Sequence, residues 1–359
     1  MKQGRSLEEL AAELVRRQNV KKDYLLDTRM MQMDAAPNFE QITITNDRSG
    51  ESIILKVNDV ADNQIRQYLD IPAKYYEKMK QENPELLAHN VNSWFRKQPE
   101  VRMVRTLDGT ARAFLSDRYH RIDNYEIAQA VLPVIAEMQD AKVESCEITD
   151  ERLYIKVVNP RLTTEVVPGD IVQSGMLITN SEVGLGQFTV QPLVYRLVCT
   201  NGMVVNDARM SRRHVGKRNE MGEDYSVYRN ETMMVNDMAF MMKVQDTVRS
   251  VVDRTKFEKV VGMMRQAKEA KITTANIPAM VELGSSDFGY TKTEGEGILS
   301  YLIRGGDLSL YGYANAATRY AQDVASYDRS TVLESIGYDI LGMSPAQWNK
   351  LQAIEMQVA

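Results

Sequence analysis

The sequence predicts an α+β protein with an antiparallel sheet core flanked by helices and a helical region at its C-terminal end. Between Lys142 and Val205, four or more strand-like segments follow one another without intervening helices, which is typical of an antiparallel sheet. Beyond about Glu223, apolar residues recur at intervals of three and four, which indicates helices. We therefore expect an α+β domain over residues 1–222 and a helical region over 223–359 that packs on it.

The first half of the chain carries the signals of helices and hairpins. Ser6 followed by Glu9 fits a capping box, which opens a helix through about Arg17. Asn83-Pro84 divides an apolar segment into two helices, because proline is tolerated only in the first turn of a helix. Alternating β-branched residues around short turns predict hairpins. In chain order we expect strands at 41–46, 52–57, 101–107 and 111–117, a helix pair within 72–95, and a helix over 124–138.

The second half begins with strands and continues with helices. The strands are expected at 142–149, 152–158, 171–180 and 188–199, with turns at 150–151, 168–169 and 201–202. The stretch 284–297 contains several glycines and is expected to be a linker or mobile loop, with helices resuming near Ile298 and Ala314. A methionine-rich stripe at helical spacing serves either packing within the chain or an oligomer seam: Met234, Met238, Met241, Gln245, Val248 and Val252.

Composition excludes several classes of protein. The 359 residues suffice for a large core, and the net charge of −5 means that any nucleic-acid site must be a local basic surface. The N-terminal stretch does not resemble a signal peptide, and no run of about 18 apolar residues occurs, so we expect a cytoplasmic protein without membrane contact. Cys146 and Cys199 are interpreted as small buried hydrophobes.

No catalytic centre or cofactor site is expected. His89, His120 and His214 are far apart in the sequence and far from either cysteine, so a structural zinc site is not expected. Walker-type lysine, nucleophile-elbow and HExxH motifs are missing, and Gly184-Leu185-Gly186 is interpreted as a turn. Carboxylates near strand ends could converge on magnesium or remain solvated turn residues: Asp117, Asp123, Glu182 and Asp207.

The strongest local signal is basic. Between Arg196 and Arg218 lie six cations against the single Asp207, and the segment 209–218 contributes Arg209, Arg212, Arg213, Lys217 and Arg218. A second group interleaves Arg96, Lys97, Arg102, Arg105, Arg112, Arg118 and Arg121 with Trp94, Phe95, Tyr119 and His120. Guanidinium groups pair with phosphates, and aromatic rings stack on unpaired bases. The alternative is that the aromatic residues are core and the arginines bridge surface carboxylates.

Several stretches together resemble an uncharacterised family common in phages and plasmids. They are IPAKYYEKM and LLAHNVNSWF, SDRYHRIDNYEI, ITNSEVGLG, YRLVCTNGMVV, SRRHVG, and the long segment from Tyr311 to Leu341. The resemblance runs from about Asp23 to Leu341. It implies one continuous domain in a mobile-element setting, among genes of replication and recombination, without an assigned activity.

The resulting hypothesis is a phage or mobile-element DNA-transaction protein that binds single-stranded nucleic acid non-specifically and without catalysis. Phosphates would contact Arg209, Arg212, Arg213, Lys217 and Arg218, assisted by Arg118, Arg121 and stacking on Tyr119. A homo-oligomer would repeat this basic surface along one strand. One alternative is an interaction protein that binds a host factor through its methionine-rich helices. A further alternative is a metal-dependent nuclease. The expected location is the cytoplasm of an infected or plasmid-bearing bacterial host.

Overall fold

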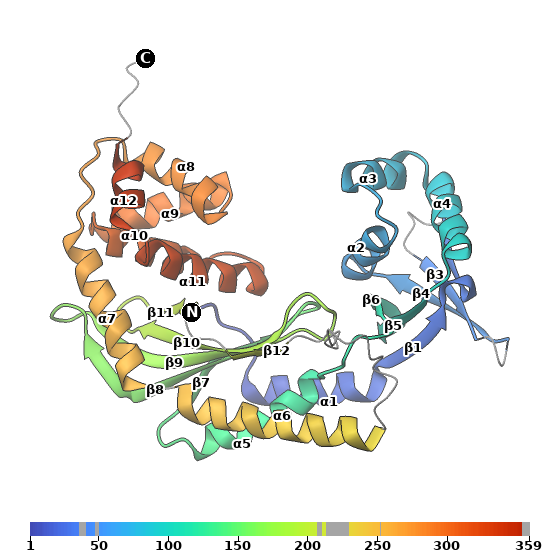
Figure 1. Cartoon of the computed structure of the whole chain (residues 1–359). Coiled ribbons are helices and arrows are strands. Elements are labelled where there is room, and N and C mark those ends of the chain that lie inside the picture. Colours follow the sequence, from blue (N-terminus) through green and yellow to red (C-terminus); the bar gives the residue numbers. More distant parts are fainter. Residues whose placement is uncertain (36–40, 47–49, 207–209, 213–229, 252, 354–359) are drawn as a thin grey trace, which may run out of the picture.

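Two six-stranded sheets and their covering helices make up the described part of the chain (Figure 1). Figure 1 draws the computed structural model, which describes residues 1–35, 41–46, 50–206, 210–212, 230–251 and 253–353. The predicted α+β class is confirmed. The boundary expected at residues 222 and 223 lies outside the described residues.

Sheet 1 is built from the N-terminal third of the chain. Its strand order is β1-β5-β6-β4-β3-β2, and β4 and β6 run parallel while the other neighbours are antiparallel. Helices α2, α3 and α4 cover one face, with Leu55, Tyr76 and Phe114 in the buried core between them. The elements are β1 (Lys22–Asp27), the short 3-10 helix η1 (Thr28–Met30), β2 (Met31–Asp34), β3 (Gln41–Thr45), β4 (Ser52–Val57), α2 (Asp59–Tyr68), α3 (Ala73–Glu82), α4 (Pro84–Lys97), β5 (Val101–Leu107) and β6 (Thr110–Ser116).

Sheet 2 is antiparallel throughout, as predicted for residues 142–205. Its order is β11-β10-β9-β8-β7, and β12 also pairs with β10. Helices α1, α5 and α6 cover one face (Figure 1). The elements are α1 (Leu7–Val20), α5 (Asn124–Glu137), β7 (Lys142–Ile148), β8 (Leu153–Glu165), β9 (Ile171–Asn180), β10 (Phe188–Arg196), β11 (Asn201–Val204), β12 (Met210–Arg212) and α6 (Asn230–Val251).

The C-terminal helices lie on the other side of sheet 2 from α1, α5 and α6 (Figure 1), where Leu177 and Leu193 share a buried cluster with Tyr327. Val172 and Val194 of the sheet share a buried core with Val260 of α7 and Tyr311 of α10. The helices are α7 (Arg254–Glu269), α8 (Ile277–Phe288), α9 (Lys292–Gly305), α10 (Leu310–Tyr320), α11 (Tyr327–Leu341) and α12 (Pro345–Gln352). Within the described residues, no helix is both long and apolar enough to cross a membrane.

Local signals in the sequence located many elements correctly. The capping box at the start of α1 is present, because the Ser6 hydroxyl accepts from the Glu9 N–H at 3.1 Å and the Glu9 carboxylate accepts from the Ser6 N–H at 2.8 Å. The hairpin of β3 and β4 and the division of α3 from α4 at Pro84 are confirmed as well. The strands β1 and β2 and helix α2 were not predicted.

The predicted linker at 284–297 is wrong, because all of this stretch except the short connection 289–291 belongs to α8 and α9. Its glycines permit close helix packing instead of chain freedom. A Cβ atom at Gly284 would lie 2.2 Å from the Tyr313 hydroxyl, and one at Gly297 would lie 2.1 Å from the Tyr320 ring. A side chain at either position would therefore overpack the interface.

The methionine stripe predicted in α6 is only partly the buried face of that helix. Phe240, Val244 and Val248 pack into the core against α5 and sheet 2. Met238 and Met242, by contrast, are 67% and 65% exposed.

The prediction that both cysteines are buried holds in part. Cys146 is buried in β7, whereas Cys199 is half-buried in the turn after β10.

Candidate nucleic-acid interface at the junction of the sheets

The residues predicted to contact nucleic acid fall into two segments, of which the structure describes one and part of the other. Arg209, Arg213, Lys217 and Arg218 lie outside the described residues. The backbone of Arg212 is described as the last residue of β12. The second segment, with Arg118, Tyr119 and Arg121, forms the turn between β6 and α5.

Strand β12 fixes where the first segment leaves sheet 2. Arg212 pairs with Phe188, Ser211 with Thr189 and Met210 with Val190. Phe188 is the first residue of β10 and directly follows residues 181–187, which we call the junction loop. The described part of this segment, residues 210–212, therefore ends beside the junction loop, at the end of sheet 2 that lies toward β6 in Figure 1.

The second segment reaches the same loop through Tyr119. Its hydroxyl donates to the Ser181 carbonyl at 3.1 Å, and its side chain is only 7% exposed. Burial raises the pKa of Tyr119 above its ordinary value, so the hydroxyl remains a donor at neutral pH. The stacking role predicted for Tyr119 is incompatible with this burial, because the ring has no open face. Tyr119 positions the turn.

The arginines on either side of Tyr119 are exposed. Arg118 makes no ion pair or hydrogen bond within the part of the chain that the structure describes. The Arg121 side chain is 56% exposed, and one of its terminal nitrogens donates to Asp23 at 3.1 Å. Both guanidinium groups therefore keep donors for an anionic partner.

The junction loop joins the two sheets. The Glu182 carbonyl accepts from Arg105 of β5 at 2.9 Å, and the Val183 carbonyl accepts from Gln64 of α2 at 2.7 Å. Gly184 packs so closely on β6 that a Cβ atom there would lie 2.6 Å from the Leu115 side chain. Of the two glycines interpreted from sequence as a turn, Gly184 thus lets the loop dock on sheet 1.

A buried charge network lies beneath this loop. The Arg105 side chain is fully buried and donates to Asp23 at 2.9 Å and to Asp123 at 2.7 Å. Lys21 also pairs with Asp123. Burial alone lowers the pKa of Arg105, but the surrounding carboxylates outweigh it and raise that pKa, so the guanidinium stays charged.

A β-bulge in β6 leaves Arg112 without a paired residue on β5. The pairing of β5 with β6 shifts at Arg105 and Thr106, which oppose Ala113 and Ala111. The Arg112 guanidinium lies 2.7 Å from the Glu182 carboxylate, and both side chains are buried. The other Glu182 oxygen accepts from the Asn124 N–H at 2.7 Å.

The arginines of the second basic group thus include exposed residues, such as Arg118 and Arg121, and residues whose side chains are engaged within the protein. Arg105 and Arg112 are buried ion-pair partners, and Arg102 stacks over Tyr68 at 4.5 Å from the ring centroid. For these three the surface prediction is wrong. Arg196, the first cation of the other basic stretch, is likewise paired, with Asp170 at 3.0 Å.

The strand-end carboxylates do not form a metal site among the described residues. Asp123 and Glu182 come together at the junction, but Lys21, Arg105 and Arg112 neutralise them. Asp117 is exposed, and Asp207 lies outside the described residues. In the part of the chain that is described, no group of three or more His, Cys, Asp or Glu side chains could hold a metal ion.

Asp123 should make the junction sensitive to acid. Burial raises the pKa of its carboxyl, but Arg105 and Lys21 more than offset this and lower the pKa to about 2. A depressed carboxyl pKa contributes stability above the unfolded value of about 4 that is lost as the pH falls through about 2. We expect Asp123→Asn to cost roughly 2 kcal/mol at pH 7 and less at pH 3, measured by urea unfolding. A cost that is the same at both pH values would contradict this role.

Comparison with known proteins gives a family but no activity. Neither a curated protein nor a solved structure matches the chain. The family model described as "Domain of unknown function (DUF932)" matches residues 112–332, more than half of the chain. The matched region begins at Arg112, and it includes the junction loop, sheet 2 and most of the C-terminal helices. The chain therefore belongs to the family of proteins with a domain of unknown function known as DUF932.

Proposed function

We propose that this protein binds single-stranded nucleic acid non-specifically, without catalysis, in the DNA transactions of a phage or other mobile element. One observation carries the proposal: the described strand 210–212 of one basic segment and the turn of the other both lie beside the junction loop. Arg212 ends the strand paired with Phe188, and Arg118 and Arg121 flank the tyrosine bound to Ser181. Their proximity supports a shared surface for phosphates.

The proposed chemistry is electrostatic. Guanidinium and ammonium groups contact phosphates, which fixes the strand without regard to its sequence. Since the Tyr119 ring is buried, phosphate contacts carry the binding and stacking on this residue is not part of it. The segment 209–218 supplies Arg209, Arg212, Arg213, Lys217 and Arg218, and the turn supplies Arg118 and Arg121.

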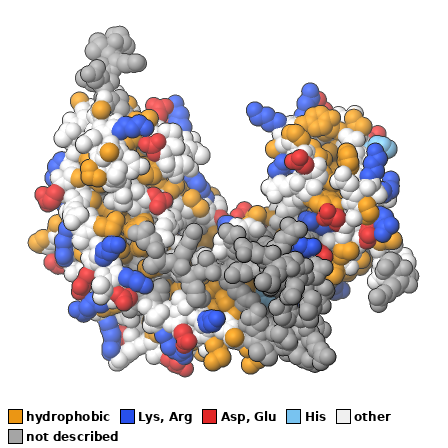
Figure 2. All heavy atoms as spheres, viewed as in Figure 1, with side chains coloured by type: hydrophobic (Ala, Val, Ile, Leu, Met, Phe, Trp, Pro, Cys, Tyr) orange, Lys and Arg blue, Asp and Glu red, His pale blue; other side chains and the backbone are white. Residues whose placement is uncertain are grey.

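Self-association would strengthen a weak local site. The net charge is −5, and Figure 2 shows basic and acidic side chains interspersed on the visible face instead of one large basic patch. A single basic surface on such a protomer binds weakly, whereas repeated surfaces along one strand add avidity. The exposed Met238 and Met242 of α6 support a homo-oligomer contact on the face of the helix that does not pack on α5.

The salt dependence of binding tests the proposal. If about four cations of the 209–218 segment and both arginines of the turn meet phosphates, the logarithmic slope of affinity against salt should be about −4, at about 0.7 per contact. Changing Arg212, Arg213, Lys217 and Arg218 together to Ala should reduce the magnitude of the slope to about 1.4. Arg118→Ala with Arg121→Ala should reduce its magnitude by about 1.4. Fluorescence anisotropy with a labelled single-stranded oligonucleotide measures these slopes.

The controls separate binding from folding. Arg304→Ala with Lys350→Ala removes two exposed cations from α9 and α12 and should leave the slope unchanged. Adding magnesium should leave the oligonucleotide intact, and cleavage would favour the nuclease alternative. Binding by the fourfold variant with the wild-type slope would exclude this surface.

A further inference from the structure

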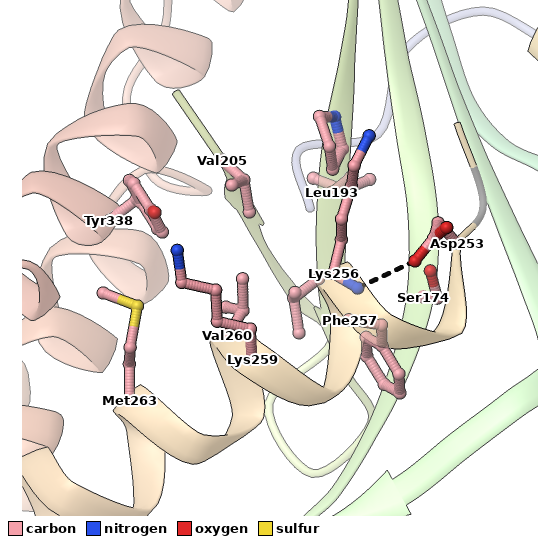
Figure 3. A pocket seen from close by; sticks show the side chains of 12 residues that line it. Ser174, Leu193, Val205, Asp253, Lys256, Phe257, Lys259, Val260, Met263 and Tyr338 are labelled. Carbon is pink, nitrogen blue, oxygen red and sulfur yellow. Dashed lines mark hydrogen bonds between the residues drawn. The ribbon is translucent and has the colours of Figure 1, made fainter. Parts of the chain in front are cut away.

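A hollow with an apolar wall lies between sheet 2 and the helices α7 and α11 (Figure 3). Leu193 of β10 and Val205, just beyond β11, form one side, and Val260 and Met263 of α7 form the other. Its volume is about 240 Å³. It shares no lining residue with the junction loop, so it is a separate feature of the molecule.

The size of the hollow limits what it can hold. A cavity of about 150 Å³ accepts benzene, whereas sites that enclose a whole small molecule usually measure about 300 to 1,000 Å³. At about 240 Å³ the hollow matches one aromatic or branched aliphatic side chain and is too small to enclose a nucleotide. Its occupant is therefore a single apolar group attached to something larger.

Two free lysines stand at the rim. Lys256 and Lys259 lie three residues apart on α7, and both are exposed. Among the described residues neither ammonium group has an ion pair or hydrogen bond. In Figure 3, Lys256 extends along Leu193 and Lys259 extends toward Tyr338 of α11. The lining residue Asp253 is already engaged, since its carboxylate accepts from the Lys256 N–H at 2.9 Å and caps α7.

A second hollow adjoins the first, and its border is acidic, whereas the rim of the first is basic. It measures about 460 Å³, shares Met263 and Tyr338 with the first, and is bordered by Asp287 and Asp339. A ligand carboxylate is therefore favoured on the lysine side and disfavoured on the aspartate side. The second hollow also gives the rest of a ligand a path away from the apolar wall.

We propose that the hollow beside α7 binds the C-terminal residue of a partner polypeptide. The apolar side chain of that residue fills the space between Leu193 and Val260, and its terminal carboxylate pairs with Lys256, on the side away from the second hollow, while Lys259 adds positive charge at the rim. The preceding residues pass Met263 and Tyr338 into the second hollow, where the aspartates favour neutral or basic residues. This site is independent of nucleic-acid binding and would recruit a protein to it.

Peptide binding tests the proposal directly. The probe is Gly-Ser-Gly-Ser-Gly-Phe with a fluorophore on its amino end and a free carboxylate, titrated with the full chain and followed by anisotropy. Replacing the Phe by Ala should weaken binding about 10- to 100-fold, because the side chain loses its burial. Amidation of the carboxylate, or Lys256→Met with Lys259→Met in the protein, should weaken it about tenfold.

Matched controls make each outcome decisive. Lys243→Met with Lys350→Met removes two exposed lysines elsewhere and should leave peptide affinity unchanged. The Lys256 and Lys259 variant should keep the wild-type melting temperature and its affinity for single-stranded DNA, so failure here is distinct from failure of the proposed function. Equal binding of acid and amide peptides, or no binding at millimolar peptide, would overturn the proposal. If N-acetylphenylalanine binds as tightly as the peptide, the site is for a small aromatic acid and the peptide assignment is wrong.

Discussion

Replacing Arg105 by alanine should lower the free energy of unfolding by about 3 to 5 kcal/mol, the cost expected when one partner of a buried ion pair is removed. Arg105 is fully buried and holds Asp23, Asp123 and the Glu182 carbonyl at once. Without its guanidinium, two carboxylates and a carbonyl lose their shared donor inside the protein. Urea unfolding at neutral pH measures the loss.

The choice of substitution sharpens this test. Arg105→Lys keeps the charge but not the planar fork, so it should recover only part of the stability. Arg118→Ala is the matched control, because Arg118 is exposed and unpaired among the described residues, and it should change stability by less than about 0.5 kcal/mol. An Arg105→Ala protein as stable as the wild type would show that the network does not hold the sheets together.

The second large effect is expected at the ion pair between sheet 2 and α11. The Lys156 ammonium group lies 2.6 Å from the Glu334 carboxylate, both side chains have no exposed surface, and the ammonium sits over the Tyr327 ring. Lys156→Met alone should cost about 3 to 5 kcal/mol, because it leaves a buried carboxylate without its cation. The double variant with Glu334→Leu should return to within about 1 to 2 kcal/mol of wild type or exceed it.

The double variant distinguishes an ion pair from simple packing. One Glu334 oxygen is buried without a hydrogen-bond partner in the described structure, so removing the whole pair also removes an unsatisfied acceptor. If the costs of the two single variants add in the double variant, the two groups do not interact energetically and this interpretation fails.

Local sequence signals predicted the elements better than they predicted the site. The Ser6 and Glu9 capping box, the β3–β4 hairpin and the break at Pro84 depend on neighbouring residues, and all three are confirmed. The docking of the two sheets on each other depends on contacts such as Arg105 with Glu182, which are 77 residues apart. No periodicity in the chain encodes such a contact.

Arginine burial was the main feature that the sequence could not reveal. Arg105 and Arg118 occur in the same arginine-rich stretch, yet one is fully buried and the other exposed. The difference follows from their partners: Asp23 and Asp123 approach Arg105 from separate elements, β1 and the start of α5. Arg105 opposes Asp23 in the β1–β5 ladder, but β1 was not predicted and three consecutive residues of β5 are buried, so strand alternation gave no signal.

Cross-linking of a bound strand tests the central claim most directly. A single-stranded oligonucleotide carrying photoreactive bases is irradiated with the full chain, and the linked peptides are mapped by mass spectrometry. We expect cross-links in the segment 209–218 and in the turn 117–121, with both lost at high salt. Cross-links confined to other surfaces, or none under conditions where a known single-strand binder is labelled, would contradict the proposed interface.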